Sequence, residues 1–330
     1  MAKKYRLETD SMGSKKVETN KLWGAQTQRS LENFKIGHEK MPLELIIALG
    51  YQKKAAVMTN MQLGKISRKL GSAIIKACDE IINFKLINHF PLSVWQTGSG
   101  TQTNMNANEV ISNRSIQILK GKLGSKNPIH PNDHVNMSQS SNDVFPTVMH
   151  IASVYAINNN LIPSIDYLYK ELLLKEKQFN KIIKIGRTHT QDATPLSLGQ
   201  EFSGYKEQIF KNKIRISNAL KEVYFIAQGG TAVGTGINAP KNFDSKFCKN
   251  LSKITRFKFF PSKNKFESIA AHDTLVNLSS SLNGLAISLF KIGNDIRFLS
   301  SGPRAGFGEL IIPENEPGSS IMPGKVNPTQ

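Results

Sequence analysis

The chain has 330 residues, which is enough for a substantial core and roughly two domains. Hydrophobic residues make up 39% of it and charged residues 21%, the composition of an ordinary globular protein. Runs of about 20 apolar residues are absent, so we expect no membrane span. The basic N-terminus is not followed by an apolar run, which argues against a secretory signal.

The two cysteines, Cys78 and Cys248, lie far apart in helix-like stretches. Two thiols do not indicate a disulfide framework, and they are too few for an iron–sulfur cluster, which needs about four. We therefore expect a reducing compartment, such as the cytoplasm. No Cys-x-x-Cys spacing occurs that would support a zinc site.

The net charge of +18 is compatible with nucleic-acid binding or with attraction of a small anionic substrate. A surface that is simply rich in lysine explains it equally well. The basic residues are not interleaved with aromatic ones, as a base-stacking surface would need. We therefore favour the lysine-rich surface and expect no nucleic-acid partner.

The first third of the chain predicts a loop-rich segment followed by three helices. Residues 1–40 have the character of loops. Pro42 then begins an apolar-periodic segment that predicts a helix to about residue 62. Two further helices are predicted, from Ser72 to about His89 and from about Asn104 to Gln117. Gly121 and Gly124 indicate a loop before Pro131.

Three longer apolar patterns follow and predict a bundle of long helices. The first begins at Val144 and continues to about Ile183, with Asn158–Asn160 and Pro163 interrupting or ending the helix. The second is a stripe with Asn212 as its only polar member: Leu198, Phe202, Tyr205, Ile209, Ile216, Ala219, Val223 and Ile226. The third keeps spacings of three and four throughout: Leu275, Leu278, Leu282, Leu285, Leu289, Ile292, Ile296 and Leu299. Such seams pack helix against helix at shallow angles, and strand patterns are nearly absent, so the sequence predicts an all-α fold.

Four polar stretches near the ends of these helices are hard to explain by packing. Residues 95–109 carry glycines, hydroxyls and amides, and a helix starting near Asn104 would direct free N–H groups at an anion. Residues 130–143 form a second polar run that leads into a helix. The alternative for both is an elaborate helix cap. We do not favour a metal site at the two histidines of the second run, His130 and His134.

Residues 186–195 place His189 in a polar loop just before a long helix, where a group that titrates near neutrality suits proton transfer. The alternative is an ordinary surface or core histidine. Residues 318–328 place two serines and Lys325 among glycines and prolines, which predicts a flexible loop carrying reactive groups. The alternative there is a disordered tail.

Together these stretches resemble the shared motifs of the fumarase/aspartase superfamily, and the resemblance covers nearly the whole chain. Residues 318–328 match the superfamily signature Gly-Ser-Ser-x-Met-Pro-x-Lys-x-Asn-Pro in full. Two details are similar to class II, iron-independent fumarases. His189 follows Gly-Arg-Thr, where aspartases tend to carry Gln, and Gly324 stands where aspartases carry Ala.

The resemblance implies a fumarate hydratase, a lyase of the tricarboxylic acid cycle that hydrates fumarate reversibly to L-malate with no metal or redox cofactor. Ser319 would be the base for the C3 proton, and His189 would act on the C2 hydroxyl through a water. The substrate-binding residues implied are Ser99, Gly100, Thr101, Asn104, Ser140, Ser141, Asn142, Thr188, Ser320, Lys325 and Asn327.

A secondary anion site is implied at His130, Pro131, Asn132 and Asp133. Some fumarases carry an arginine at the position of Asn127, and here the neighbouring Lys126 would have to replace it.

The resemblance also implies a long-helix bundle of the fumarase/aspartase type with a mixed, loop-rich N-terminal domain. We place that domain at residues 1–139 and the bundle domain at residues 140–330. Family members are homotetramers whose active sites draw loops from three subunits, so we expect an inactive monomer. They also continue beyond the position of Gln330 with more bundle helices and a small C-terminal domain. We therefore expect the chain to be C-terminally truncated, with an exposed apolar seam that favours aggregation.

Other functions stay open at this point. An aspartase-like ammonia-lyase of the same superfamily would release ammonia from aspartate and not dehydrate malate. A non-catalytic remnant is the alternative that the expected truncation suggests. Nucleic-acid binding rests on net charge alone, and it would have to show the salt dependence of phosphate contacts.

Overall fold

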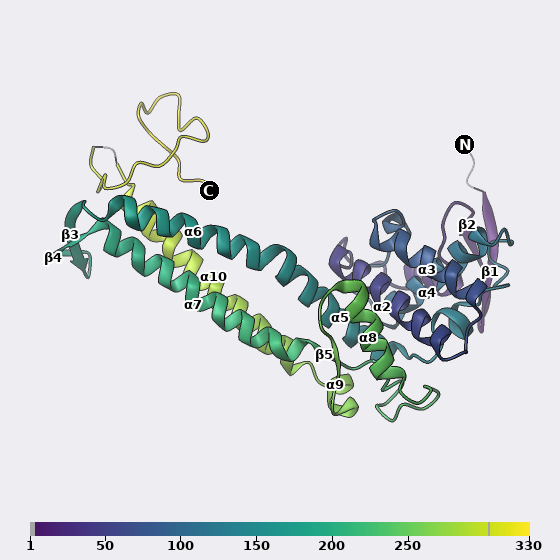
Figure 1. The fold of residues 1–330 in the computed structure, drawn as a ribbon. Helices are drawn as coiled ribbons and strands as arrows, with labels where there is room; N and C mark the ends of the chain where they lie inside the picture. The colour runs from purple at the N-terminus through teal and green to yellow at the C-terminus, as the bar shows by residue number, and fades with distance from the viewer. Residues whose placement is uncertain (1–3, 303) are drawn as a thin grey trace. The chain divides into compact units, whose positions relative to one another are not determined.

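The computed structural model describes residues 4–302 and 304–330 and divides the chain into two compact units. The first unit comprises Met1–Asn160 and Leu220–Leu275, and the second comprises Leu161–Ala219 and Val276–Gln330. Helices dominate both units (Figure 1). The predicted all-α fold is thus confirmed in its main feature, although three small two-stranded sheets accompany the helices.

The first unit begins with an antiparallel hairpin of β1 (Tyr5–Asp10) and β2 (Gly13–Glu18), followed by α1 (Ala25–Asn33). The prediction of loops for residues 1–40 was wrong. The hairpin has apolar side chains on its outer face, where Tyr5 and Leu7 are more than half exposed. On β1 the inner face carries Arg6 and the buried Glu8, so the usual alternation of apolar-in and polar-out residues is reversed in this strand, whereas β2 contributes the buried Val17 opposite Arg6.

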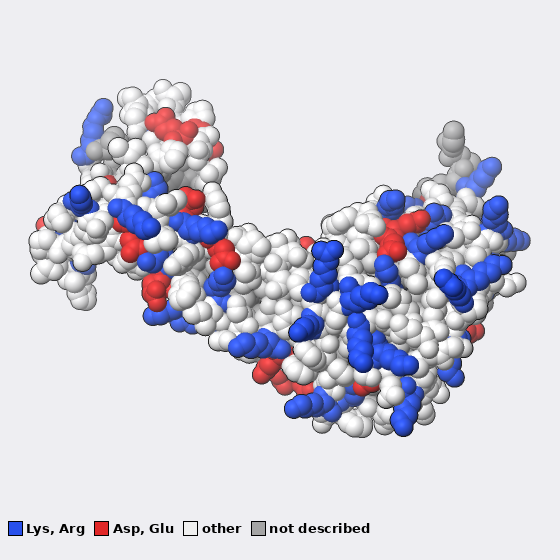
Figure 2. All heavy atoms as spheres, in the orientation of Figure 1, with Lys and Arg blue, Asp and Glu red and all other residues white. Residues whose placement is uncertain are grey.

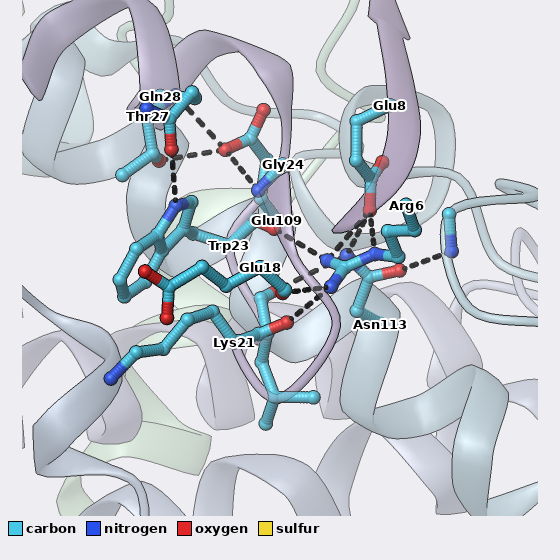
Figure 3. Close-up of polar contacts among 12 residues, drawn as sticks. Arg6, Glu8, Glu18, Lys21, Trp23, Gly24, Thr27, Gln28, Glu109 and Asn113 are labelled. Carbon is cyan, nitrogen blue, oxygen red and sulfur yellow. Dashed lines mark hydrogen bonds and ion pairs between the residues drawn. The ribbon is translucent and has the colours of Figure 1, made fainter. Parts of the chain in front are cut away.

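Arg6 fixes this hairpin to the chain that follows it (Figure 3). Its guanidinium pairs with Glu8 at 2.8 Å and donates to the backbone carbonyls of Glu18, Lys21 and Trp23 at 2.7–2.8 Å. A guanidinium has five N–H donors, so this one partly buried arginine can bind several backbone carbonyls at once.

A buried carboxylate fixes α1 to α4 (Thr101–Ile118). Glu109 of α4 accepts hydrogen bonds from the backbone N–H groups of Gly24, Gln26 and Thr27 and from the Thr27 hydroxyl, at 2.6–3.1 Å. Figure 3 shows Glu109 beside Gly24 and Thr27. The N-cap of α1 is Gly24, which has no side chain to cap these amides. Burial raises the pKa of Glu109, and its four donors oppose that rise.

Helix α2 (Leu43–Gln62) is the central element of the first unit. It packs mainly against α3 (Arg68–Ile82), α5 (Ser141–Ala156) and α8 (Phe243–Thr255). The prediction for α2 is confirmed. The next helix was predicted to extend to His89, but α3 ends at Ile82, since Phe84 has a positive φ of 64° that an α-helix cannot contain. A short 3-10 turn, η1 (Ile87–His89), follows.

Smaller elements complete the first unit. They are the π turn η2 (Pro131–Val135), the parallel strand pair β5 (Phe225–Ile226) and β6 (Phe260–Pro261), and α9 (Lys265–Ala270). Cys78 and Cys248 are both buried and unpaired.

The asparagine run does not end the long helix. Residues 141–179 stay helical through α5, one π turn η3 (Ile157–Leu161) and α6 (Ile162–Phe179). Pro163 lies directly after this π turn, in the first turn of α6, and removes one N–H donor from the continuous helix. The helix ends at Phe179, about four residues before the predicted end.

The second unit contains three long helices and a hairpin. Helix α6, α7 (Leu198–Val223) and α10 (Asp273–Leu299) lie alongside one another, and the hairpin of β3 (Ile183–Thr188) and β4 (Gln191–Ser197) joins α6 to α7 (Figure 1). Contacts between the helices include Phe179 on Phe202, with ring centroids 5.1 Å apart, and the Asn212 amide, which donates to the Ser288 hydroxyl at 2.8 Å.

The predicted stripe of α7 is confirmed as a buried seam. Every one of its helical members is buried, including Asn212, and Ile226 is buried beyond the helix end in β5. Only half of the predicted α10 stripe is buried: Leu278, Leu285, Ile292 and Leu299. These positions are seven apart. The members between them are less covered, and Leu289 is 42% exposed.

Helix α10 also exposes large apolar side chains outside the stripe, among them Ile287 and Phe290 at 62% and 75%. By length and composition alone this helix could cross a membrane. Its most apolar 18-residue stretch has a mean hydropathy of 1.2, and 17% of that stretch is buried. One such helix among the described residues is weak support for a membrane protein. The same composition suits a helix whose outer face packs against other helices.

The compact units do not follow the predicted domains 1–139 and 140–330. Helix α5 packs on α2 and so groups with the N-terminal helices, as does the segment Leu220–Leu275. The division at residue 139 stays a prediction.

We predict that Glu109→Gln lowers the free energy of unfolding by about 2–3 kcal/mol, because an amide NH₂ group would face buried backbone donors. Thermal and urea unfolding followed by circular dichroism measure the change. Glu32→Gln is the matched control, since Glu32 is exposed and its pairs with Lys15 and Gln28 lie at the surface. Its effect is expected within about 0.5 kcal/mol. Equal effects of the two variants would contradict the capping role of Glu109.

Candidate functional site

Asn104, a predicted substrate-binding residue, is fully buried in the first turn of α4. Its amide donates to the Ser141 hydroxyl at 2.8 Å and to Asn136 Oδ1 at 3.3 Å. Ser141 is the first residue of α5. The starts of α4 and α5 therefore meet through these side chains, and two of the predicted substrate-binding residues lie together.

The preceding turn presents small hydroxyls next to Gly100, the N-cap of α4. Gly100 has φ 69°, and a Cβ there would lie 2.2 Å from the Phe145 ring, so only glycine fits. The Ser99 and Thr101 hydroxyls are 3.1 Å apart at the surface. The Ser99 hydroxyl accepts from the Thr101 N–H at 3.4 Å, but Gly100 has no side chain to cap the amides of Gln102 and Thr103, which are donors suited to a carboxylate. The helix begins three residues before the predicted start at Asn104.

Ser140 and Asn142 have structural partners. Ser140 is the N-cap of α5 and forms a capping box with Asp143, and the Asn142 amide donates to the Ala232 carbonyl at 2.8 Å. The alternative explanation of this stretch as a cap therefore holds for Ser140. Its predicted role in substrate binding stays a prediction, as does that of Asn142.

Asp143 connects this cap to a distant loop. Its buried carboxylate accepts from the Ser140 N–H, the Gln228 amide and the N–H groups of Gly229 and Thr231, each at 2.9 Å. Burial raises the pKa of Asp143 to about 6, and the backbone donors oppose the rise. The start of α5 is thus held rigidly against residues 228–231.

The predicted secondary anion site lies on η2, beside a cavity of about 220 Å³ that Lys126, His130, Pro131 and Asn132 help to line. His130 Nδ1 accepts from the backbone N–H groups of Asn132 and Asp133, each at 3.3 Å. That nitrogen must be unprotonated to accept them, and burial lowers the pKa of His130 accordingly. These two amides are therefore occupied by the histidine ring.

In the second unit, His189 lies at the tip of the β3–β4 hairpin and not in the predicted loop. His189 and Thr190 have φ of 54° and 61°, both in the left-handed region. A two-residue turn of this kind usually carries Asn-Gly, and a β-branched residue there is strained. Such strain is often found at functional positions, and here it holds His189 exposed next to Thr188.

Glu309, which follows α10, fixes the base of this hairpin. It pairs with Arg187 and Lys184 at 2.6 Å each, and Lys184 also pairs with Glu201 at 2.7 Å. Burial acts to raise the pKa of Glu309, but the hydrogen bonds from Arg187 and Lys184 outweigh it and hold that pKa below its ordinary value. The Arg187 guanidinium lies 4.3 Å from the centre of the Phe307 ring, beside a cavity of about 500 Å³.

The signature segment, residues 318–328, has no helix or strand. A Cβ at Gly318 would lie 1.8 Å from the Lys325 carbonyl oxygen, so this close approach requires glycine. The Asn327 amide donates to the Gly318 carbonyl at 3.2 Å, and the Ser319 hydroxyl accepts from the Ile321 N–H at 3.4 Å. Lys325 and Ser320 are exposed, and Ser319 is half-buried.

The predicted site residues thus form two groups. Ser99 to Asn104 and His130 to Asn142 lie in the first unit, whereas Thr188, His189 and residues 318–327 lie in the second. Within the parts of the second unit that are described, no hydrogen bond or ion pair joins His189 to Ser319.

Comparison with known proteins agrees with these motifs. Residues 13–330 match a family described as lyase. The chain is 61% identical to the class II fumarate hydratase of Brucella suis over 98% of its own length and 70% of the relative's. It is 60% identical to the mitochondrial fumarate hydratase of Rhizopus oryzae over 99% of its own length and 66% of the relative's. The chain belongs to the lyase family that contains the class II fumarate hydratases.

Solved structures of this lyase family share the fold. The class II fumarase of Schistosoma mansoni matches with a TM-score of 0.96 and 45% identity, over 99% of this chain and 72% of that one. The native form of the Brucella melitensis fumarate lyase:delta crystallin matches with a TM-score of 0.91 and 38% identity, over 98% and 74%. The predicted long-helix bundle type is confirmed.

Sequence reasoning did not single out several residues that shape the site. Asn136 bonds with Asn104, and Glu309 holds the hairpin. Asn136 lies in one of the four polar stretches and could have been found there. Glu309 had no such signal, because its partners Lys184 and Arg187 are over 100 residues away in the sequence.

We predict that Glu309→Gln loosens the β3–β4 hairpin, since both cations at its base lose their shared carboxylate. Amide hydrogen exchange of residues 183–197 should become faster by about fivefold, the factor given by roughly 1 kcal/mol of local opening. Glu314→Gln, at an exposed glutamate in the same segment, is the control and should leave the exchange unchanged. Unchanged exchange in both variants would show that Glu309 does not hold the hairpin.

Proposed function

We propose that this chain is a fumarate hydratase that interconverts fumarate and L-malate by acid–base chemistry. The observation that carries the proposal is the pair of intact motifs at residues 186–195 and 318–330 in a chain 61% identical to a class II fumarate hydratase. The reaction so written uses no metal or redox cofactor.

The chemistry requires removal of a weakly acidic C3 proton and stabilisation of the carboxylate that gains charge. We assign the base to Ser319, whose hydroxyl needs a dry, electropositive site to lose its proton. The Lys325 ammonium and the Asn327 amide would bind the carboxylate as its charge increases. Ser320 would contribute a further donor from the same segment.

At C2, His189 would protonate the departing hydroxyl through a water, with Thr188 positioning it. The exposed, strained hairpin tip supports this role, because it presents the imidazole away from the body of the hairpin. In the hydration direction the same groups act in reverse: a water loses a proton towards His189 and adds to C2 while C3 is protonated.

Substrate carboxylates would be held by the first group of residues. The N-terminal turns of α4 and α5 offer Ser99, Thr101, Asn104 and Ser141 beside Gly100, and uncapped amides favour an anion there. Ser140 and Asn142 would act at the same place. A second anion beside the segment from His130 to Asp133 would be held by the Lys126 ammonium, in place of an arginine, because the N–H groups of Asn132 and Asp133 are occupied by the His130 ring.

The assembly we propose is a homotetramer with active sites shared by three subunits. The supporting observation is the outer face of α10, where Ile287, Leu289 and Phe290 are 42–75% exposed. Exposed apolar area of this extent on a long helix is typical of an interface between subunits. A cytoplasmic enzyme of the tricarboxylic acid cycle fits this proposal, and no membrane partner is needed.

We do not propose a nucleic-acid partner. Figure 2 shows lysine and arginine side chains spread over the visible face, with acidic residues among them, and not gathered into one stripe. A groove that follows a phosphate backbone would need a continuous basic track.

The direct test is the ultraviolet absorbance of fumarate after L-malate is added to the purified chain. Wild type should form fumarate, and Ser319→Ala should reduce kcat by at least about a thousandfold, as loss of a catalytic group does. Ser14→Ala, at an exposed serine of β2, is the control and should keep full activity. Ammonia from L-aspartate without fumarate from malate would favour the ammonia-lyase, and no turnover of either would favour an inactive remnant.

A further inference from the structure

Lys53, on α2, is a fully buried lysine in the first unit. Its ammonium donates to Asn136 Oδ1 at 2.9 Å and to Gln139 Oε1 at 3.0 Å. No carboxylate lies within ion-pair distance among the contacts described for residues 4–302 and 304–330. A buried lysine is costly unless it is paired, so this arrangement requires an explanation.

The two amides are oriented for a positive charge. The Gln139 NH₂ group donates to the carbonyls of Val135 and Met137 at 3.1 and 3.0 Å, which turns its oxygen towards Lys53. The same oxygen also accepts from the Gln52 amide at 3.0 Å. Lys53 therefore faces amide oxygens, the polar atoms that stabilise an ammonium group.

The contacts of Lys53 lead directly to the candidate site. Asn136 Oδ1, which accepts from Lys53, also accepts from the Asn104 amide. That amide in turn donates to the Ser141 hydroxyl. The ammonium thus lies one side chain behind Asn104, in the group of residues assigned to a substrate carboxylate.

The charged and titratable groups around Lys53 do not neutralise it. On α5, the Asp143 carboxylate is occupied by four N–H donors of its own, and it attracts the ammonium only from a distance. On α3, burial raises the pKa of the Cys78 thiol, so this group stays neutral. Asp79 on α3 pairs with the neighbouring Lys54 at 2.6 Å. Burial lowers the pKa of Lys53 itself to about 7.

We propose that Lys53 is a positioning residue for the substrate: its buried ammonium aligns Asn136 and Asn104 with Ser141 and supplies a positive charge that a bound carboxylate balances. This inference rests on the proposed function. A dianion that binds near Lys53 stabilises the protonated form of this lysine. At a pH where Lys53 is neutral in the free protein, binding is therefore accompanied by uptake of a proton. Affinity should therefore weaken as pH rises above about 7, where free Lys53 is increasingly neutral.

The first test compares Lys53→Met with Lys54→Met, a neighbouring lysine on the same helix that lies outside the site. We expect Lys53→Met to raise KM for L-malate about tenfold with a smaller change in kcat, the pattern of lost binding shared by ground and transition states. The rise of KM with pH above 7 should also disappear. Lys54→Met should stay within about twofold of wild type at each pH. A folded Lys53→Met with wild-type KM and pH profile would overturn the inference while leaving the proposed function intact.

A second test uses the wild type and does not depend on whether a variant at position 53 folds. Calorimetry of succinate binding to wild type, in two buffers with different ionisation enthalpies, measures the protons taken up on binding. We expect uptake to be larger at pH 8 than at pH 6, and to persist in His189→Asn, which removes the imidazole of the candidate site. Binding without uptake at both pH values would overturn the role of Lys53, whether or not malate is turned over. Absence of both turnover and succinate binding in wild type would instead overturn the proposed function, and the inference with it.

Discussion

The rest of the second unit depends on burial of one apolar seam, the stripe of α7. Its members are covered along the whole helix, and the single polar one, Asn212, satisfies its amide on Ser288 of α10 and on its own helix. A buried asparagine within such a seam costs stability but fixes which helix lies opposite, and in which register. The hairpin that carries His189 comes directly before α7, and the signature segment follows α10. The seam between α7 and α10 therefore positions the helices to which the hairpin and the signature segment are attached.

In the first unit the decisive interactions are buried charges, each satisfied in its own way. Glu109 caps α1, Asp143 fixes the start of α5, and Lys53 faces amide oxygens. Removing one partner from such a group leaves an unsatisfied charge, which is expensive in a low-dielectric interior. Two of the three, Asp143 and Lys53, lie behind the residues assigned to the substrate. The same contacts that stabilise this unit thus also determine how rigidly the residues assigned to substrate binding are held.

The sequence predicted the long helices well because their apolar period is regular over many turns. The seam of α7 and the span of α2 are examples. Both missed hairpins broke a local rule. In β1 the inner face carries Arg6 and Glu8 in place of apolar residues, and in β3–β4 the turn is His189-Thr190 in place of Asn-Gly. The asparagine run was given too much weight, since a π turn absorbs it within a continuous helix.

Motifs could locate the candidate site residues, but not their partners. The resemblance to the superfamily implied Asn104 and Ser141 as substrate-binding residues, and the structure brings them within 2.8 Å. Ser140 matched the motif equally well, yet its hydroxyl caps a helix, a role that hydroxyl motifs cannot separate from binding. Lys53 and Glu309 were missed because each acts through contacts with residues more than 80 positions away.

The central claim is that the two groups of site residues work together across copies of the chain. Its most direct test is to unfold and refold, as a mixture, Ser141→Ala and Ser319→Ala, two variants that should each be nearly inactive alone. If a site takes Ser141 from one copy and Ser319 from another, random assortment in an oligomer leaves about a quarter of the sites intact. Malate turnover near a quarter of wild type would support the account. A mixture no more active than its components, although assembled as oligomers, would contradict it.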